Sequence, residues 1–431
     1  MSQPLCIAIA GLGTVGAGTL RVLQQHGDLL AARAGRPLAV TAVSAKSRTK
    51  DRGVSIDDVA WFDDPVAMAR EAEADVVIEL IGGEDGPAKA TCEAALAAGR
   101  HVVTANKALL AVNGAGLADA AAQAGKALNF EAAVAGGIPI VKALREGLAG
   151  NNITRVYGIL NGTCNYILTE MREQRRSFED VLDEAQRLGY AEAEPSMDVD
   201  GIDAGQKLAL LSSLAFGSRI NFDGVYIEGI RHISLLDIDY AEELGYRIKL
   251  LGSAQRTERG LEQRVYPRMV DQRQPIAHVE GAENAVVAIG DFVGNTMFQG
   301  AGAGAGPTAS AVVADIVDIA RDHRTPTLGI SAGELESLPE APIGSHRGPY
   351  YVRLMVSDRP GVIADVTAVF RDEAVSIESM IQRARSETEA VPVVLNMHEC
   401  EEAAMQRALS RIATLDSVVE APTMIRIESL A

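Results

Sequence analysis

Two lysines and a group of carboxylates are the side chains of this chain best suited to acid–base chemistry. Five carboxylates precede Lys207 between residues 189 and 207, and Asp203 stands four residues before it, so both share one face of a predicted helix. Lys107 stands two residues after the largely apolar run at 101–105 and therefore lies where a predicted strand ends. Carboxylates bind an ammonium group, and a partly desolvated lysine with a lowered pKa transfers a proton near neutrality. A surface ion pair on a capped helix is the alternative interpretation.

A glycine loop near the start of the chain has the form of a dinucleotide-binding turn. The apolar run Leu5–Ala10 predicts a strand, G-x-G-x-x-G follows at 11–16, and a helical pattern comes next. This order gives a tight turn at Gly11, a close approach to pyrophosphate at Gly13 and close helix packing at Gly16, with free N–H groups at the helix start. The expected cofactor-binding residues of the loop are Gly11, Leu12, Gly13, Thr14, Val15 and Gly16.

The loop after the second predicted strand decides which dinucleotide is expected. A carboxylate at this point binds the ribose hydroxyls of NAD, whereas basic groups accommodate the 2′-phosphate of NADP. Lys46 and Arg48 lie here, and no carboxylate occurs before Asp51. We expect NADP, with NAD and a merely solvated basic loop as the alternatives. Beside a nicotinamide, the lysines and carboxylates predict hydride transfer on a small amino-acid-like alcohol or aldehyde.

Alternating apolar strands and amphipathic helices predict an α/β fold with a Rossmann-type parallel sheet in residues 1–135. The predicted strands are Leu5–Ala10, Leu38–Ser44, Asp75–Ile81, His101–Ala105 and Ala127–Ala132. The predicted helices include Pro87–Ala98 and Gly116–Ala124. In such a sheet the ligands bind at the carboxyl ends of the strands, which is where Lys107 is expected.

The pattern changes after residue 135. Residues 136–325 mix long helices, such as Gly201–Phe216 and Thr308–Ala320, with strands, which predicts an α+β domain for substrate binding and dimerisation. Residues 326–348 contain several prolines and predict a linker. Residues 349–431 follow the order β-α-β-β-α-β, which predicts a ferredoxin-like domain.

Composition narrows the classes of partner. A chain of 431 residues predicts two or three domains, and a net charge of −18 argues against nucleic acid and anionic membranes as partners. Four scattered cysteines predict reduced thiols rather than a disulfide framework or a zinc site. No signal peptide or membrane-spanning stretch is evident. We therefore expect a cytoplasmic enzyme.

Taken together, the motifs resemble those of homoserine dehydrogenase, and the resemblance covers essentially the whole chain. Besides the glycine loop, they are the segments 79–83, 104–107, 161–168, 198–207 and 304–312. The resemblance implies reversible reduction of L-aspartate 4-semialdehyde to L-homoserine with NAD(P)H, a step toward threonine, methionine and isoleucine. A related oxidoreductase acting on another small amino-acid aldehyde, and a sensor without catalysis, are the alternatives.

The resemblance also implies roles for single residues. Lys207 resembles the proton donor to the forming alkoxide, and Lys107 its partner beside the nicotinamide and the substrate oxygen. The residues resembling substrate-binding carboxylates are Glu192, Asp198 and Asp203. The residues resembling further cofactor contacts are Gly189 and Gly306. The residues resembling a loop that binds a monovalent cation such as Na⁺, largely through backbone oxygens, are Glu131, Val134, Gly136 and Ile138.

The last 80 or so residues resemble an ACT domain, a module that binds small regulatory ligands. Gly361 would let an amino acid approach the start of a helix, whose N-terminus favours the ligand carboxylate. The resemblance implies feedback inhibition by L-threonine through paired ACT domains, in a homodimer or homotetramer. A dimerisation module without a ligand is the alternative.

Overall fold

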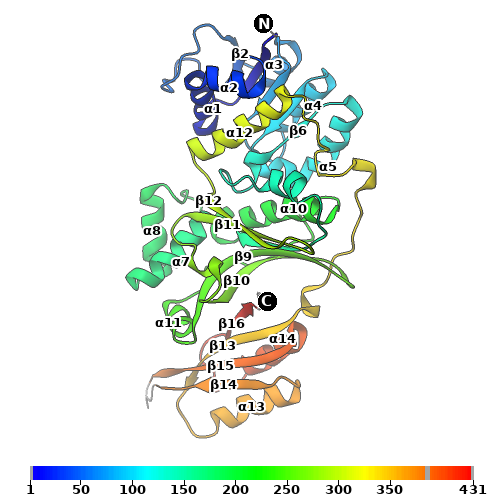
Figure 1. Ribbon diagram of the computed structural model, residues 1–431. Coiled ribbons are helices and arrows are strands. Elements are labelled where there is room, and N and C mark those ends of the chain that lie inside the picture. Colours follow the sequence, from blue (N-terminus) through cyan, green and yellow to red (C-terminus); the bar gives the residue numbers. More distant parts are fainter. Residues whose placement is uncertain (1–2, 384–388, 429–431) are drawn as a thin grey trace.

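The computed structural model describes residues 3–383 and 389–428, in three parts stacked along one axis (Figure 1). The first part is a parallel sheet of six strands in the order β3-β2-β1-β4-β5-β6. Its strands are β1 (Leu5–Ala10), β2 (Leu38–Ser44), β3 (Ala60–Phe62), β4 (Val76–Glu79), β5 (His101–Thr104) and β6 (Leu128–Asn129). The strand order reverses between β1 and β4, where ligands bind in doubly wound sheets, so the predicted Rossmann-type fold is confirmed.

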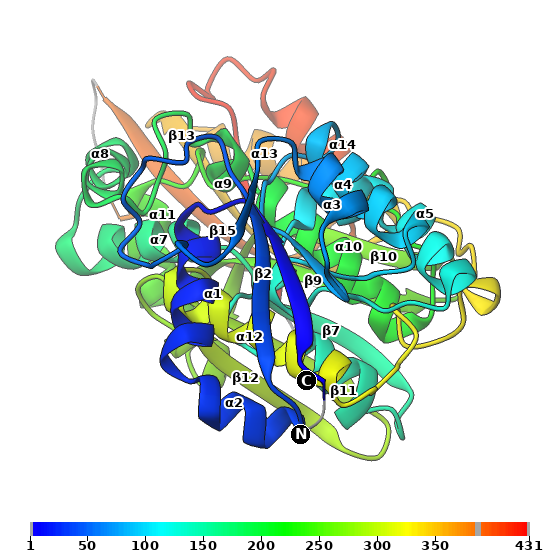
Figure 2. The ribbon, with the colours of Figure 1, turned by 90° about the horizontal axis from the view of Figure 1, so that it is seen from above.

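The helices of this part are α1 (Thr14–Gln25), α2 (Gly27–Ala34), α3 (Pro65–Glu71), α4 (Pro87–Ala97) and α5 (Lys107–Ala124). A sixth, α12 (Ala305–Ala320), returns from much later in the chain and packs beside α1 (Figures 1 and 2). The absence of a side chain at Gly18 permits this approach, because a Cβ there would lie 2.7 Å from the carbonyl oxygen of Ala305. Helix α12 lies within the sequence range 136–325 that was predicted as one domain, but in space it packs with the first part.

Two predicted elements differ from those observed. A strand over Ala127–Ala132 is wrong beyond Asn129, because the chain turns into a 3₁₀ helix, η1 (Glu131–Ala133), in which the N–H of Ala133 donates to the carbonyl of Phe130. The helix predicted from Gly116 begins nine residues earlier, at Lys107. The glycines at 114 and 116 lie inside it, and tertiary packing overrides their low helix propensity.

The second and third parts share one sheet of ten strands. Its strands are β7 (Ile153–Ile159), β8 (Tyr226–Ile227), β9 (Tyr246–Thr257), β10 (Gly260–Asp271), β11 (Glu283–Gly290), β12 (Gly294–Ala301), β13 (Arg347–Ser357), β14 (Ile377–Ile381), β15 (Ala390–Glu401) and β16 (Thr423–Glu428). The order is β12-β11-β7-β9-β10-β16-β13-β15-β14, with β8 beside β10. The two parts join because β16 pairs in parallel with β10, with Arg426 opposite Arg268.

One long helix lies between this sheet and the first part. The helices here are α6 (Ile140–Lys142), which continues into the π-helical turn η2 (Ala143–Gly147), α7 (Gly162–Gln174), α8 (Phe178–Leu188), α9 (Ser196–Val199), α10 (Ile202–Phe216) and α11 (Leu235–Glu243). Helix α10 is buried on almost every side from Asp203 to Leu214 and contacts β7, β9, β10 and α5. Its apolar sequence fits such a central position, which holds Asp203 and Lys207 between the two parts.

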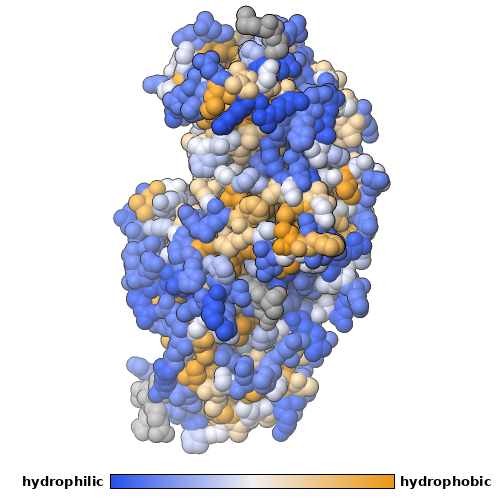
Figure 3. Space-filling model, in the orientation of Figure 1, coloured by the Kyte–Doolittle hydropathy of each residue, from blue (hydrophilic) through white to orange (hydrophobic). Residues whose placement is uncertain are grey.

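The third part adds α13 (Val362–Asp372) and α14 (Glu402–Ile412), and its strands follow the order β16-β13-β15-β14. The predicted ferredoxin-like fold is therefore confirmed. Its core packs apolar residues of the sheet, such as Leu354 and Leu395, against Phe370 of α13. The part of the chain that the structure describes contains no helix that is both long and apolar enough to cross a membrane. The face in Figure 3 is largely hydrophilic, which agrees with the net charge of −18.

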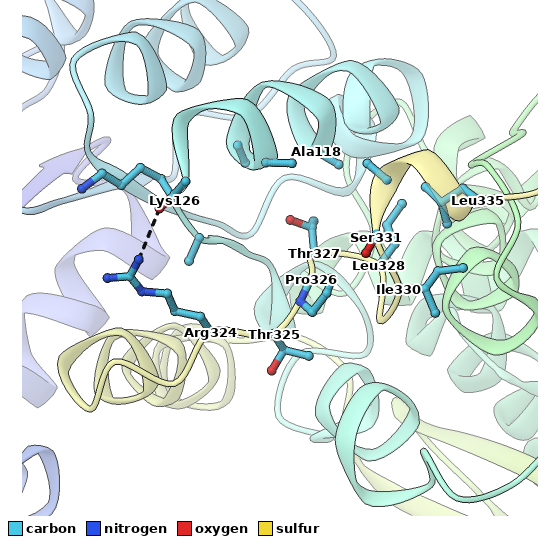
Figure 4. Close-up of a pocket in the computed structure, with 15 residues that line it drawn as sticks. Ala118, Lys126, Arg324, Thr325, Pro326, Thr327, Leu328, Ile330, Ser331 and Leu335 are labelled. Atoms are coloured by element: carbon cyan, nitrogen blue, oxygen red, sulfur yellow. Dashed lines mark hydrogen bonds between the residues drawn. The ribbon is translucent and has the colours of Figure 1, made fainter.

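The segment from 321 to 346 connects α12 to the third part and includes the 3₁₀ turns η4 (Ala332–Glu334) and η5 (Ile343–Ser345). It passes along α5 and borders a cavity of about 340 Å³ lined by Leu328, Leu335 and three alanines of α5, Ala118, Ala121 and Ala122 (Figure 4). Arg324 donates to the carbonyl of Gly125 at the end of α5. The segment is thus packed against the domain rather than extended away from it.

Candidate active site

The turn from β7 into α7 forms the floor of the candidate site. Asn161 caps α7, because its Oδ1 accepts a hydrogen bond of 2.8 Å from the N–H of Cys164. Its Nδ2 donates to Asp198 Oδ1 at 2.7 Å and to Asp203 Oδ2 at 2.8 Å. The preceding carbonyl, of Leu160, accepts from the ammonium group of a lysine on α10. One turn therefore fixes groups from α9 and α10.

The two lysines expected from the sequence meet on one carboxylate. Lys207 Nζ lies 2.8 Å from Asp203 Oδ2 and 2.7 Å from the carbonyl oxygen of Leu160. Lys107 Nζ lies 3.1 Å from Asp203 Oδ1. Asp203 and Lys207 are only 6% and 8% exposed, so the surface ion pair considered from the sequence is excluded. Two lysines 100 positions apart in the chain thus carry their ammonium groups to one carboxylate.

The charges of the site follow from this geometry. Burial alone would raise the pKa of Asp203, but the ammonium groups of Lys207 and Lys107 lower it to about 2. The Asp203 carboxylate raises the pKa of Lys107 above its usual value and outweighs the desolvation of that lysine. The expected lowering of a lysine pKa is therefore wrong for Lys107. This group stays protonated at neutral pH, which suits stabilisation of a developing negative charge.

A second buried network positions Lys107. Asn106 caps α5 by accepting from the N–H of Leu109 and donates its amide to the carbonyl of Gly83 at 2.7 Å. The fully buried carboxylate of Glu79, at the end of β4, accepts from the Thr104 hydroxyl at 2.6 Å and from two backbone N–H groups. These bonds compensate the buried charge and tie the ends of β4 and β5 together beneath Lys107.

The remaining candidate carboxylates lie nearer to solvent. Burial raises the pKa of Asp198, although its bond from Asn161 opposes the shift. Glu192 is exposed in the segment between α8 and α9, and its charge contributes to the raised pKa of Lys107. Gly189 ends α8 with a left-handed φ of 78°. The segment is held to α7 because the Thr163 hydroxyl donates to the carbonyl of Tyr190. The Asn161 amide thus bridges Asp198 and Asp203, whereas Glu192 lies at the exposed rim of the candidate site.

The glycine loop fits a dinucleotide. Gly13 is exposed, and its Cβ position is open, while α1 begins without a side-chain cap or an acidic residue in its first turn. Free N–H groups at such a helix start favour a phosphate. A cavity of about 400 Å³ beside the loop is lined by Leu12, Lys46 and Ser47, among others. Arg48 is exposed outside this lining.

A steric test of this loop is available at Gly16. A Cβ there would lie 2.0 Å from the carbonyl oxygen of Gly11, so Gly16→Ala must displace the turn, at a cost of about 1–3 kcal/mol. We expect the Kd for NADPH, measured by fluorescence titration, to rise about tenfold or more. Gly27→Ala is the control, because its Cβ position on α2 is open. An unchanged Kd for Gly16→Ala would contradict the assignment of the loop.

A second pair of loops meets between the first two parts. Gly136 and Gly137 lie against the chain that enters α12: the N–H of Gly137 donates to the carbonyl of Ala301, and a Cβ at Gly136 would lie 2.4 Å from the carbonyl oxygen of Gly302. Gly306 lies in the first turn of α12, with open space at its Cβ position. The chain at 300–302 thus packs against the predicted cation loop.

The predicted cation loop itself is built around a buried carboxylate. The Glu131 carboxylate accepts hydrogen bonds from the N–H groups of Val141 and Lys142. Burial, and to a smaller extent the negative charge of nearby Asp315, raises the pKa of Glu131 to about 7. Its side chain is therefore engaged by the protein. The carbonyls of Glu131 and Ile138 each accept one backbone hydrogen bond and keep a second lone pair. Oxygen ligands for a cation would have to come from such backbone groups.

Three contributors were not singled out from the sequence. Asn161 belongs to the motif 161–168, and its single local signal is the capping pattern before α7. Glu79 is a carboxylate at the end of a buried strand, which is itself a signal. Arg52 donates to the carbonyl of Leu12 at 3.0 Å and to those of Lys50 and Ser47, and so clamps the basic loop to the glycine loop. Nothing local in the sequence indicates that contact.

Comparisons with known proteins agree with this site. Residues 11–131 match the NAD-binding domain of homoserine dehydrogenase, residues 139–317 match homoserine dehydrogenase, and residues 350–416 match the ACT domain. The chain is 44% identical to a homoserine dehydrogenase of Neisseria gonorrhoeae over 99% of both chains. A crystal structure of a homoserine dehydrogenase from Thiobacillus denitrificans superimposes with a TM-score of 0.93 at 46% identity, covering 100% of this chain and 99% of the other.

A hyperthermophilic archaeal homoserine dehydrogenase in complex with NADPH superimposes with a TM-score of 0.65 at 26% identity, covering 75% of this chain and 100% of the other. The chain belongs to the homoserine dehydrogenases, which are NAD(P)-dependent oxidoreductases acting on a CH–OH group, and it carries a C-terminal ACT domain.

Proposed function

We propose that the enzyme interconverts L-homoserine and L-aspartate 4-semialdehyde, with Lys207 as the proton donor to the alkoxide. The observation that carries this assignment is the bridge of Lys107 and Lys207 across the buried Asp203 carboxylate. Both lysines lie at the carboxyl side of the parallel sheet, and Lys107 starts the helix that follows β5. The reaction would supply the precursor of threonine, methionine and isoleucine.

The residues around the Asp203 carboxylate then have separate roles in the reaction. A bound NADPH supplies the hydride. Negative charge grows on the substrate oxygen, where the protonated Lys107 stabilises it and Lys207 delivers a proton. Both oxygens of Asp203 are engaged by these lysines and by Asn161, which favours orientation of the ammonium groups over the substrate binding that the resemblance implies for this carboxylate. Asp198 and Glu192 remain to bind the ammonium group of the substrate.

NADP is the proposed cofactor. Lys46 lines the cavity beside the glycine loop, and Arg48 follows two residues later on the same loop. Basic groups at this point pair with the 2′-phosphate of NADP. The archaeal relative with bound NADPH supports the choice. Gly189 and Gly306 are proposed to contact the cofactor from the substrate side.

The decisive experiment is the initial rate of L-homoserine oxidation, followed at the nicotinamide absorbance with NADP⁺ and NAD⁺ in parallel. We expect a higher kcat/KM with NADP⁺, and we expect Lys46→Ala to raise the KM for NADP⁺ about tenfold while leaving that for NAD⁺ unchanged. Folded protein that oxidises another small amino-acid alcohol instead would transfer the assignment to that substrate. Equal KM changes for both cofactors would contradict the role of Lys46.

A monovalent cation is proposed for the loop at 131–138. Backbone oxygens of Glu131, Val134, Gly136 and Ile138 would hold it, since the Glu131 side chain is engaged elsewhere. Its contribution would be to fix the contact between this loop and the chain entering α12. Na⁺ suits such a set of hard oxygen donors.

L-Threonine is the proposed effector, bound at the start of α13. Gly361 precedes this helix with a φ of 98° and open space at its Cβ position. We expect Gly361→Asn, which tolerates positive φ and fills that space, to raise the inhibitory threonine concentration about tenfold without changing kcat. Gly245→Asn is the control, because Gly245 has a similar φ of 84° and also faces open space. Full threonine sensitivity in Gly361→Asn would place the effector elsewhere.

Paired ACT domains are proposed to join two or more copies of the chain. Strand β14 ends the ten-stranded sheet in the described part of the chain and so offers an unpaired edge. Light scattering of the purified protein should give the mass of a homodimer or homotetramer. A monomer at micromolar concentration would contradict this proposal.

A further inference from the structure

Asn161 joins two carboxylates of the active site and is itself buried. Its side chain is 4% exposed and lies where β7 gives way to α7. Its Nδ2 donates to Asp198 on α9 and to Asp203 on α10, at 2.7 and 2.8 Å. No other side chain in the described residues is hydrogen-bonded to both carboxylates. A neutral amide therefore links two negative groups that would otherwise repel each other.

The cap on α7 fixes the orientation of this amide. Oδ1 accepts from the N–H of Cys164, so Nδ2 must face the carboxylates. The reverse orientation would place oxygen against two carboxylates and NH₂ against an N–H group, so all three of these hydrogen bonds would be lost. The same turn supplies the carbonyl of Leu160, which holds Lys207. The position of Lys207 is thus set from this turn both directly and through Asp203.

We propose that Asn161 is a positioning residue of the reaction, whose amide holds Asp198 for the substrate and Asp203 for Lys207. This inference rests on the proposed function, because it assigns the two carboxylates to substrate binding and to orientation of the proton donor. Capping of α7 is a separate task of the opposite end of the same side chain. The two tasks can therefore be separated by substitution.

Charged groups on the elements around Asp198 determine the pH at which this carboxylate titrates. Lys107 of α5 and Lys207 of α10 lower the pKa of Asp198, whereas burial and Asp203 raise it. The thiol of Cys164 on α7 faces the same carboxylates, and burial raises its pKa well above the usual value. Loss of the Asn161 amide removes a bond that favours ionised Asp198. The pKa of Asp198 then rises further, so activity should disappear at a higher pH on the acidic side.

The test uses two substitutions of Asn161 that retain an oxygen to cap α7 but lack the amide NH₂ group. Asn161→Asp and Asn161→Ser both keep an N-cap oxygen, since Asp and Ser cap helices about as well as Asn. Asn161→Ser removes both amide N–H donors without adding charge and leaves only one hydroxyl donor on a shorter side chain, which cannot serve both carboxylates. Asn161→Asp removes the donors and also adds a third carboxylate. Ser177→Ala, which removes the N-cap of α8 away from the site, is the matched control for capping alone.

We expect kcat/KM for L-homoserine to fall about 10- to 100-fold in Asn161→Ser and further in Asn161→Asp, because the lost donor served charged groups. The acidic limb of the pH profile should move to higher pH, while the KM for NADP⁺ and the unfolding midpoint stay near those of the unaltered enzyme. Ser177→Ala should keep its activity. Unaltered kinetics in Asn161→Ser would overturn the inference, even if Asn161→Asp is impaired. Failure of the unaltered enzyme to oxidise homoserine would instead refute the proposed function.

Discussion

Lys207→Ala should lower kcat for L-homoserine oxidation by about 100- to 10,000-fold, which is the usual loss when a positioned general acid is removed. The Lys207 ammonium group lies between Asp203 Oδ2 and the carbonyl of Leu160, whereas the Lys107 ammonium group contacts the other oxygen of Asp203 and does not occupy this position. The Kd for NADPH should change little, because the glycine loop proposed to bind it lies between β1 and α1, away from Lys207 on α10. Stopped-flow turnover and fluorescence titration separate the two quantities.

Lys207→Met and Lys126→Met complete this experiment. Methionine at 207 fills the volume without the charge, so a similar loss of kcat separates lost proton transfer from a collapsed cavity. Lys126 lies after α5 at the cavity near Arg324, and its substitution should leave turnover unchanged. A turnover number for Lys207→Ala equal to that of the unaltered enzyme would remove Lys207 from the mechanism.

The local parts of the fold could be predicted from the sequence. Strand β1 and the glycine loop occur within 12 residues, and Asp203 and Lys207 are one helical turn apart, so their geometry follows from backbone period alone. The order of elements after residue 349 was sufficient for the ferredoxin-like fold. Each of these features depends on residues that are close in sequence.

The contacts that complete the site could not be predicted in this way. The ion pair between Lys107 and Asp203 joins residues 96 positions apart. Helix α12 packs beside α1 after nearly 300 residues, and glycines permit the close backbone contacts that this packing needs, at Gly18 against Ala305 and at Gly136 against Gly302. The raised pKa of Lys107 could not be predicted for the same reason: burial is suggested by local sequence, but the compensating carboxylate is not. The pairing of β16 with β10 likewise depends on complementary edges far apart in the chain.

Arg353→Met should destabilise the enzyme by about 3–5 kcal/mol, because it leaves a buried carboxylate without its cation. Asp237 is fully buried at the junction between α11 and β13, where Arg353 contacts both of its oxygens, at 2.7 and 3.1 Å. The Tyr351 hydroxyl adds a bond of 3.1 Å to the same carboxylate. Arg353 also donates to Thr423 on β16. The pair therefore holds the ACT domain to the catalytic part.

Arg347→Met is the matched control on the same strand. Arg347 pairs with Glu399 at 3.1 Å, but both side chains are more than 60% exposed, so this ion pair should contribute at most about 1 kcal/mol. Urea unfolding followed by circular dichroism should show a lower midpoint for Arg353→Met than for Arg347→Met and the unaltered enzyme. Removing both charges with Asp237→Asn and Arg353→Met should recover part of the loss, because the unpaired charge is what costs stability. Equal midpoints for the two arginine variants would mean that the buried pair does not hold the domains together, and the coupling would then rest on the pairing of β16 with β10.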